Sequence, residues 1–316
     1  MSVTPTRQLT RIPVSERLAA APISWGVCEV PGWGVELPPD RVLAEMSALG
    51  LRATEFGPIG YLGADPRAVV ALLERHGLRL VGGFVPAVLH DPAELGDTLA
   101  SVARTAALYA ECGATFLVSA AVVDTAWSPR RPLHTDEWRH LLDALARLDE
   151  LASSHGLRHV LHPHAGTLVE TADDVSRVLA GSDVRFCLDT GHLAIGGTDP
   201  VAFAEEAAAR IAHVHLKDVR QEVAVRLQAG EVSLVQAVRL GLFQPLGGGD
   251  LPVADTVLAL ERKGYDGWYV LEQDTTLESG TTPEGAGPVE DVQRSITFLN
   301  RFLAPAGAGS NRRQGG

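Results

Sequence analysis

Cysteine is scarce in this sequence: three residues, Cys28, Cys112 and Cys187, occur among 316. Their number is odd, their spacing is wide and no Cys-x-x-Cys motif is present. This pattern argues against a disulfide framework and against a structural zinc site built from thiolates. It is typical of a reduced protein, and we expect a cytoplasmic location.

Basic residues are also scarce: the sequence has 27 lysine and arginine residues and 39 aspartate and glutamate residues, which gives a net charge of −12. Nucleic-acid binding requires a basic face that pairs with phosphates, so nucleic acid is not expected as a partner. No apolar run approaches the roughly 20 residues that cross a membrane. The first 22 residues lack the apolar core of a signal peptide, and we expect no membrane association.

The sequence has instead a repeated pattern of helix ends and helix starts. A helical segment ends in Gly-Leu-Arg, and an apolar run follows, at Gly50, Gly77 and Gly156. Glycine is common after a helix because it adopts the left-handed conformation without strain. Asp-Pro opens a helical pattern at 65–66, 91–92 and 199–200. Because Asp caps free N–H groups and Pro fits the first turn, these signals predict repeating strand–helix units.

Eight apolar runs are predicted to be strands, and most lack a polar face, as in a parallel sheet covered by helices. They occupy residues 23–25, 54–56, 80–84, 115–118, 159–164, 184–189, 211–217 and 268–273. Eight such units in about 300 residues predict an α/β fold, a single (β/α)8 TIM barrel. A doubly wound sheet is the alternative, but no G-x-G-x-x-G motif follows the first predicted strand.

The expected barrel domain spans residues 20–304. An N-terminal extension at 1–19 precedes it, and a Gly- and Ala-rich tail at 305–316, which we expect to be disordered, follows it. The longest gap between predicted strands, at 219–250, separates the seventh from the eighth. We expect a helical insertion there over the barrel mouth. It ends in a flexible turn of three glycines, 247–249, and its length would allow a lid.

Side chains that can bind a metal collect at the ends of predicted strands five to eight, where TIM barrels form their active sites. One candidate from each strand gives the set His164, Asp189, His215 and Glu272. Each residue alone is more often a rim or capping residue, but four on consecutive strands favour a metal site. Two imidazoles and two carboxylates suit Mn²⁺, Co²⁺, Fe²⁺ or Zn²⁺ better than Ca²⁺.

Further strand-end residues are expected to contact a substrate. The polar ones are Glu55, Glu170, His192 and Lys217, and Trp25 and Trp33 could wall one face of a sugar-like ring. For both tryptophans, ordinary packing is an equal alternative. His213 shares a strand face with His215 but lies deeper, and we expect a supporting or packing role for it.

Three segments resemble the motifs of the xylose isomerase-like TIM barrels, the sugar isomerase/epimerase superfamily. They are LDTGH at 188–192, HVHLKD at 213–218 and LEQD at 271–274. Four others resemble the inosose (2-keto-myo-inositol) dehydratases of that superfamily: PISWGVCEVPGWG at 22–34, TEFGPIGYLG at 54–63, HPHAGTLVET at 162–171 and GLFQPLGGGD at 241–250. The likeness covers about residues 20–303.

The resemblance implies that Asp189, His215 and Glu272 ligate a divalent metal, most often Mn²⁺ or Co²⁺, and that the chain forms a homo-oligomer. In many members the fourth ligand is a glutamate at the end of strand five, which doubles as a base. Here that position matches His164, and Glu170 matches a second acidic position. This departure weakens an epimerase assignment and is compatible with a lyase.

We therefore expect a metal-dependent lyase that dehydrates a cyclic polyhydroxy ketone, 2-keto-myo-inositol, through an enediolate stabilised by the metal. The expected base is Glu272 or Glu170, and the expected acid is His192 or Lys217. A metal-dependent ketose isomerase or 3-epimerase is the alternative, and in either case the partner is a small keto-polyol or ketosugar. The acidic charge disfavours a metal-dependent nuclease, and the converging ligand-type residues disfavour a purely sugar-binding barrel.

Overall fold

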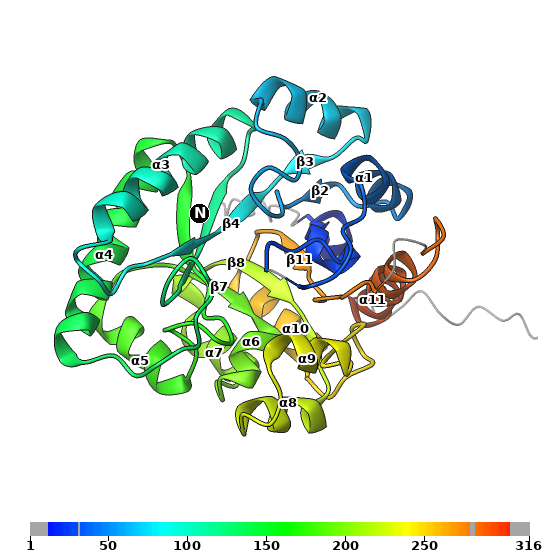
Figure 1. Cartoon of the computed structure of the whole chain (residues 1–316). Helices are drawn as coiled ribbons and strands as arrows, with labels where there is room; N and C mark the ends of the chain where they lie inside the picture. The colour runs from blue at the N-terminus through cyan, green and yellow to red at the C-terminus, as the bar shows by residue number, and fades with distance from the viewer. Residues whose placement is uncertain (1–11, 31, 279–281, 304–316) are drawn as a thin grey trace, which may run out of the picture.

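The computed structural model describes residues 12–30, 32–278 and 282–303. It forms a barrel of parallel strands inside a ring of helices (Figure 1). Neighbouring strands follow the order β3, β2, β1, β11, β8, β7, β6, β5, β4. They are β1 (Leu18–Ala20), β2 (Ala53–Thr54), β3 (Arg79–Leu80), β4 (Gly82–Ala87), β5 (Phe116–Ala121), β6 (Arg158–Leu161), β7 (Phe186–Asp189), β8 (Ile211–Leu216) and β11 (Tyr269–Leu271).

The two ends of this sheet are joined through Val81, which lies between β3 and β4. The Val81 N–H donates to the Thr54 carbonyl of β2, and the Val81 carbonyl accepts from the Phe116 N–H of β5. β3 and β4 are therefore two halves of one strand position. The sheet closes around eight such positions, and the predicted TIM barrel is confirmed.

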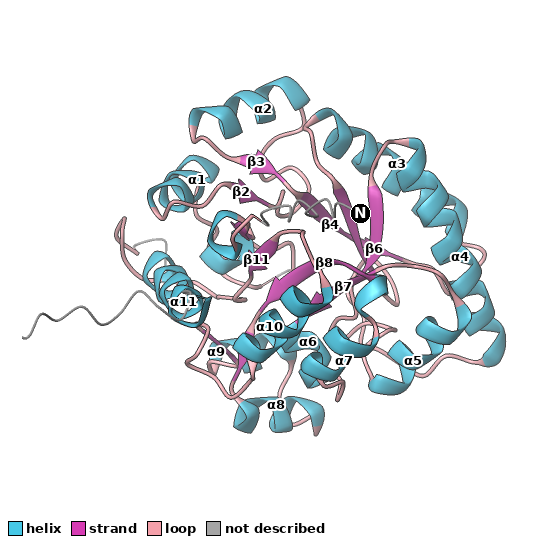
Figure 2. Cartoon of the chain, turned by 180° about the vertical axis from the view of Figure 1, so that it is seen from behind, coloured by secondary structure: helices cyan, strands magenta, loops and turns pink. Residues whose placement is uncertain are grey.

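Helices cover the outside of the barrel (Figure 2). They are α1 (Pro39–Ala48), α2 (Pro66–Arg75), α3 (Leu95–Glu111), α4 (Thr135–Ser154), α5 (Ala172–Gly181), α6 (Thr190–Ile195), α7 (Pro200–Glu206), α10 (Val253–Lys263) and α11 (Pro288–Leu303). Gly50, Gly77 and Gly156 adopt φ values of 79°, 66° and 76°, as their position after a helix requires. Among the described helices, none has the length and apolar character to span a bilayer.

The first strand was predicted at the wrong place. Residues 23–25 belong to a 3-10 helix, Pro22–Trp25, which ends at Gly26 with φ 82°. Pro22 has no N–H to give to a sheet and favours this turn. The strand is the short run Leu18–Ala20, which crosses the predicted boundary between the N-terminal extension at 1–19 and the barrel domain. The expected tail at 305–316 lies outside the described residues.

The Asp-Pro signals were correct at two of three positions. Asp65 and Asp199 accept N–H groups at the starts of α2 and α7. Asp91 instead accepts the Ala93 N–H within a turn, and α3 begins only at Leu95. The Asp–Pro pair is compatible with either a helix start or a turn, so the dipeptide alone does not separate them.

The predicted insertion between the last two strands contains α8 (Gln221–Gln228) and α9 (Leu234–Arg239). A small antiparallel sheet of β9 (Asp218–Val219) and β10 (Phe243–Gln244) holds its two ends together. The buried Asp218 carboxylate accepts four backbone N–H groups, those of Val219, Gly247, Gly249 and Leu251, at 2.8–3.1 Å. The glycine turn, expected to be flexible, is thus wrapped around a carboxylate.

We expect Asp218→Asn to lower the free energy of unfolding by about 1–3 kcal/mol, because the amide turns a donor toward buried N–H groups. Urea denaturation measures the loss. Asp250→Asn is the matched control, since that exposed carboxylate in the same loop accepts one N–H, from Gln221 at 2.8 Å, and should cost below about 1 kcal/mol. Equal losses for the two variants would show that Asp218 does not anchor the loop.

Candidate active site

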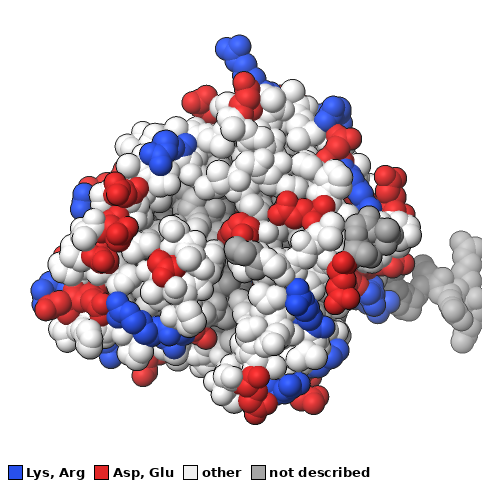
Figure 3. Space-filling view, viewed as in Figure 1, with Lys and Arg blue, Asp and Glu red and all other residues white. Residues whose placement is uncertain are grey.

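A cavity of about 550 Å³ opens where the strands end. Most of its polar lining comes from strand ends: Glu55 after β2, His162 and His164 after β6, His215 in β8, and Glu272 and Asp274 after β11. Acidic side chains lie near the centre of the face seen in Figure 3. The cavity therefore lies where a TIM barrel forms its active site.

Three of the four predicted metal ligands converge beside this cavity. Donor atoms of Asp189, His215 and Glu272 all lie within 4.8 Å of one another, and all three side chains are buried. His215 Nδ1 lies 2.9 Å from Glu272 Oε2 and 3.7 Å from Asp189 Oδ2. The approach to Glu272 lacks hydrogen-bond geometry, so this buried nitrogen has no hydrogen-bond partner.

Glu55 explains why one strand carries two histidines. A single oxygen of its carboxylate lies 2.7 Å from His213 Nε2 and 3.0 Å from His215 Nε2. A carboxylate only accepts hydrogen bonds, so both Nε2 atoms carry the proton. His215 then turns Nδ1, the nitrogen not bound to Glu55, toward the carboxylates of Asp189 and Glu272.

The charges of these groups perturb one another strongly. Burial alone would raise the pKa of Glu55, but His215 and His213 lower it to about 2. Burial alone would lower the pKa of His215, but the carboxylates of Glu272 and Glu55 raise it well above its usual value. Without a cation, a proton therefore occupies the space between His215 and the carboxylates, and any cation that binds there must displace it.

Lys217 lies behind the carboxylates rather than in the cavity. Its buried ammonium contacts Asp189 Oδ2 at 3.3 Å, Asp274 Oδ1 at 2.9 Å and Glu272 Oε1. Burial alone would lower the pKa of Lys217, but these carboxylates raise it well above its usual value. Lys217 thus supplies one permanent positive charge to three carboxylates, and Glu55 lies nearby. The permanent negative charges of the cluster therefore outnumber the positive ones.

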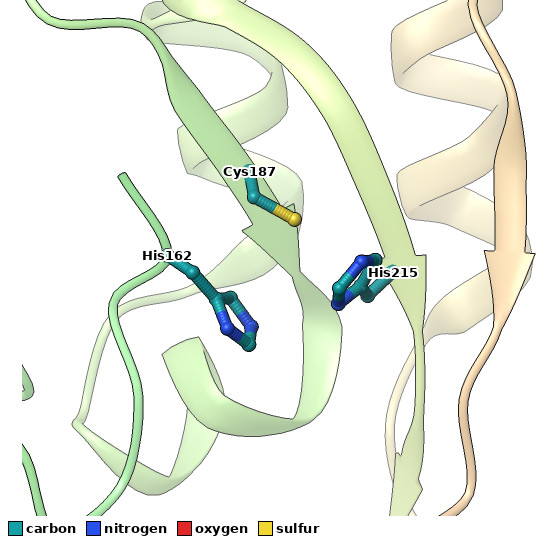
Figure 4. A group of neighbouring side chains, drawn as sticks. All are labelled: His162, Cys187 and His215. Atoms are coloured by element: carbon teal, nitrogen blue, oxygen red, sulfur yellow. The ribbon is translucent and has the colours of Figure 1, made fainter. Parts of the chain in front are cut away.

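The side chains of Cys187 and His162 lie beside that of His215 (Figure 4). Donor atoms of these three buried residues also lie within 4.8 Å of one another. Burial is the main cause that raises the pKa of the Cys187 thiol to about 11. The thiol is thus neutral near pH 7, and the carboxylates are the stronger ligands for a hard divalent cation.

The fourth predicted ligand, His164, does not join the converging group. Its Nδ1 donates to the Ala165 carbonyl at 2.8 Å, and its ring packs on His192 with centroids 3.7 Å apart. Burial, with the neighbouring His162 and Lys217, lowers the pKa of His164 to about 3. His162, two residues earlier, lies 3.4 Å from Asp189 Oδ2 and is the nearer strand-end imidazole. Alternation along the strand could not distinguish the two histidines, since they share a face.

Four residues expected to act on a substrate do not line the cavity: Trp25, Glu170, His192 and Lys217. Trp25 is a fully buried core residue whose indole N–H donates to Glu45. Glu170 pairs with Arg130 at 3.0 Å and accepts the Gly166 N–H. The other expected contacts, Glu55 and Trp33, do line it.

Two further residues were not expected in the site. Asp274 lines the cavity, and burial is the main cause that raises its pKa to about 6. The sequence signal that could have identified Asp274 was its place in the LEQD motif at 271–274. Trp127 also lines the cavity. Its ring stacks on that of Phe84 with centroids 6.1 Å apart, and its backbone φ is 60°. No sequence pattern predicts a left-handed tryptophan, which is rare for a bulky side chain.

Comparisons with known proteins agree with this arrangement. Residues 43–302 match the family described as xylose isomerase-like TIM barrel. An inosose dehydratase of Geobacillus kaustophilus is 33% identical, over 91% of this chain and 94% of that protein. The rhizopine catabolism protein MocC of Rhizobium meliloti is 31% identical, over 93% of this chain and 90% of that protein.

Solved structures share the fold at lower identity. An L-ribulose 3-epimerase superposes with a TM-score of 0.67 at 17% identity, over 91% of this chain and 94% of that one. The IolI protein with a bound zinc atom superposes with a TM-score of 0.66 at 14% identity, over 91% of this chain and 98% of that one. From the barrel, the strand-end cluster and the family match, we conclude that this chain belongs to the xylose isomerase-like TIM barrel family.

Proposed function

We propose that this chain is a divalent-metal-dependent hydro-lyase that dehydrates a cyclic keto-polyol, with 2-keto-myo-inositol as its expected substrate. The observation that carries the proposal is the orientation of His215, whose Nε2 contacts Glu55 and whose Nδ1 faces the carboxylates of Asp189 and Glu272. The substrate class rests on the likeness to inosose dehydratases over nearly the whole chain.

The donor set fits a divalent cation. Asp189, His215 and Glu272 would hold it, and His162, whose Nδ1 has no hydrogen-bond partner, is the nearest further candidate in place of His164. Mixed nitrogen and oxygen ligands without a thiolate support Mn²⁺ or Co²⁺ as the ion. When bound, such a cation supplies Lewis acidity that polarises a ketone and acidifies the neighbouring C–H.

Asp274 is the better candidate for the base than Glu272 or Glu170. Burial alone would raise the pKa of Glu272, but His215 and Lys217 hold it well below the usual value, so this carboxylate binds protons weakly. Glu170 lies outside the cavity and is paired with Arg130. Asp274 faces the cavity with a pKa raised to about 6, close to the value that proton transfer near neutral pH requires.

One carboxylate could complete the elimination. Asp274 takes the proton from the carbon next to the ketone, and the electron pair moves toward the ketone oxygen. Asp274 then returns this proton to the hydroxyl on the adjacent carbon, whose C–O bond breaks as water leaves. The resulting enol becomes a 1,2-dione by tautomerisation. His192 and Lys217, the acids expected earlier, do not line the cavity: the Lys217 ammonium contacts Asp274, and His192 Nε2 contacts that ammonium.

An isomerase or 3-epimerase remains the alternative, because it begins with the same proton transfer. An epimerase needs a second base on the opposite face of the substrate. The strand-end residues after β6 that line the cavity are His162 and His164, and burial lowers the pKa of both. Their lone pairs are weak bases at neutral pH, which favours the lyase.

Proton NMR of Mn²⁺-loaded protein with 2-keto-myo-inositol in D₂O tests the reaction. We expect loss of ring signals and appearance of the dehydrated dione. Asp274→Asn should slow turnover by at least about 100-fold, the usual effect of losing a positioned acid–base group. Glu170→Gln is the matched control and should stay within about threefold of the parent. Deuterium entry beside the ketone without water loss would reject the lyase in favour of the epimerase.

We expect Glu55→Gln to weaken metal binding by about 10–100-fold, because the neutral amide lacks the negative charge that strengthens both hydrogen bonds and fixes the His215 tautomer. Competition with a chromophoric chelator measures the affinity of the folded protein for Mn²⁺. Glu170→Gln, which removes a carboxylate outside the cavity, should leave the affinity unchanged. Unaltered affinity in Glu55→Gln would remove Glu55 from the metal site.

A further inference from the structure

The cavity has polar lining residues at the ends of the strands and mainly apolar ones on the surrounding loops and on α9. The groups that can hold a keto-polyol, including Glu55, His215, Glu272 and Asp274, lie together at the ends of the strands. The volume of about 550 Å³ falls within the range of about 300–1,000 Å³ that drug-sized ligands fill. A six-carbon ring that reaches the strand ends therefore leaves much of the cavity to be filled.

Two apolar walls enclose the remaining space. The first comes from the loop after β1 and from α9 of the insertion, with Ile23, Trp33, Leu234 and Val235. The indole N–H of Trp33 is already used, since it donates to the Thr275 carbonyl at 2.8 Å. This wall therefore presents carbon surface to a ligand.

The second wall is the pair of Phe84 and Trp127, whose rings stack with planes 15° apart. This wall adjoins the polar strand ends, since each ring centroid lies 6.1 Å from that of His164. Trp127 is held in its left-handed conformation by a turn in which Asp124 accepts the N–H groups of Ala126 and Ser128. A strained backbone that presents an aromatic ring to a cavity is typical of a ligand clamp. Aromatic faces pack against apolar groups.

Polar partners are few outside the strand ends. Among the described residues that line the cavity there is no lysine or arginine, and the lining outside the strand ends has only Glu29 and Ser233 as carboxylate or hydroxyl side chains. A phosphate group would lack a cation to pair with. Ring hydroxyls that reached the apolar walls would lose water without gaining a hydrogen bond.

We propose that the substrate is an uncharged keto-polyol that carries an apolar substituent, an O-alkyl or O-aryl ether, seated between these walls. The inference rests on the proposed function, because the ketone must lie at the strand ends. The substituent removes the apolar walls from water and stays on the ring during dehydration. The unsubstituted ring then remains a substrate, but a poorer one.

The test compares 2-keto-myo-inositol with its O-methyl, O-butyl and O-benzyl ethers, using Mn²⁺-loaded protein. We expect kcat/KM for dehydration to rise along the series, by at least about tenfold for the benzyl ether. Quenching of tryptophan fluorescence by the benzyl ether gives a binding constant independent of turnover, since Trp33 and Trp127 line the cavity.

Val235→Asn places an amide on the apolar wall and should reduce the preference for the benzyl ether by at least about threefold. Val225→Asn is the matched control: it makes the same change in the same insertion, on an exposed residue of α8 that does not line the cavity. This control should keep the full preference, and thermal melting of both variants checks their folding.

The outcomes separate this inference from the proposed function. Turnover of 2-keto-myo-inositol with equal or lower kcat/KM for every ether would overturn the inference and leave the lyase intact. If no compound loses water or exchanges its proton beside the ketone, but the benzyl ether still binds in preference, the cavity inference survives and the lyase fails.

Discussion

A single carboxylate oxygen of Glu55 accepts hydrogen bonds from two imidazoles, and the rest of the site depends on this contact. Glu55 follows β2, whereas His213 and His215 lie in β8, across the barrel and far along the chain. The contact forms only when the barrel closes. It fixes where the proton of His215 resides, and so which nitrogen is free to face Asp189 and Glu272.

The charge arrangement follows from that contact. The buried carboxylates of Asp189, Glu272 and Asp274 have Lys217 as the permanent cation that contacts them in the described part of the chain. Buried carboxylates that share one partner repel one another unless further positive charge is supplied. In the function we propose, a divalent cation would supply this charge where a proton otherwise resides.

The features that could be predicted from the sequence were those indicated by local patterns of residues along the chain. The barrel, most strands and the convergence of Asp189, His215 and Glu272 followed from apolar runs and from residues at strand ends. The position of β1 could not be predicted in this way, because its three residues, Leu-Ala-Ala, have little preference for a strand. The exclusion of Trp25 and Glu170 from the cavity depends on Glu45 and Arg130, partners distant in sequence that no local pattern identifies.

Locating a bound cation tests the central claim most directly. Anomalous scattering from crystals grown with Mn²⁺ would give its position without reference to catalysis. We predict one peak within coordination distance of His215 Nδ1 and of the carboxylates of Asp189 and Glu272. A peak beside Cys187 and away from Glu272, or no peak at saturating Mn²⁺, would contradict the assignment of this cluster as the metal site.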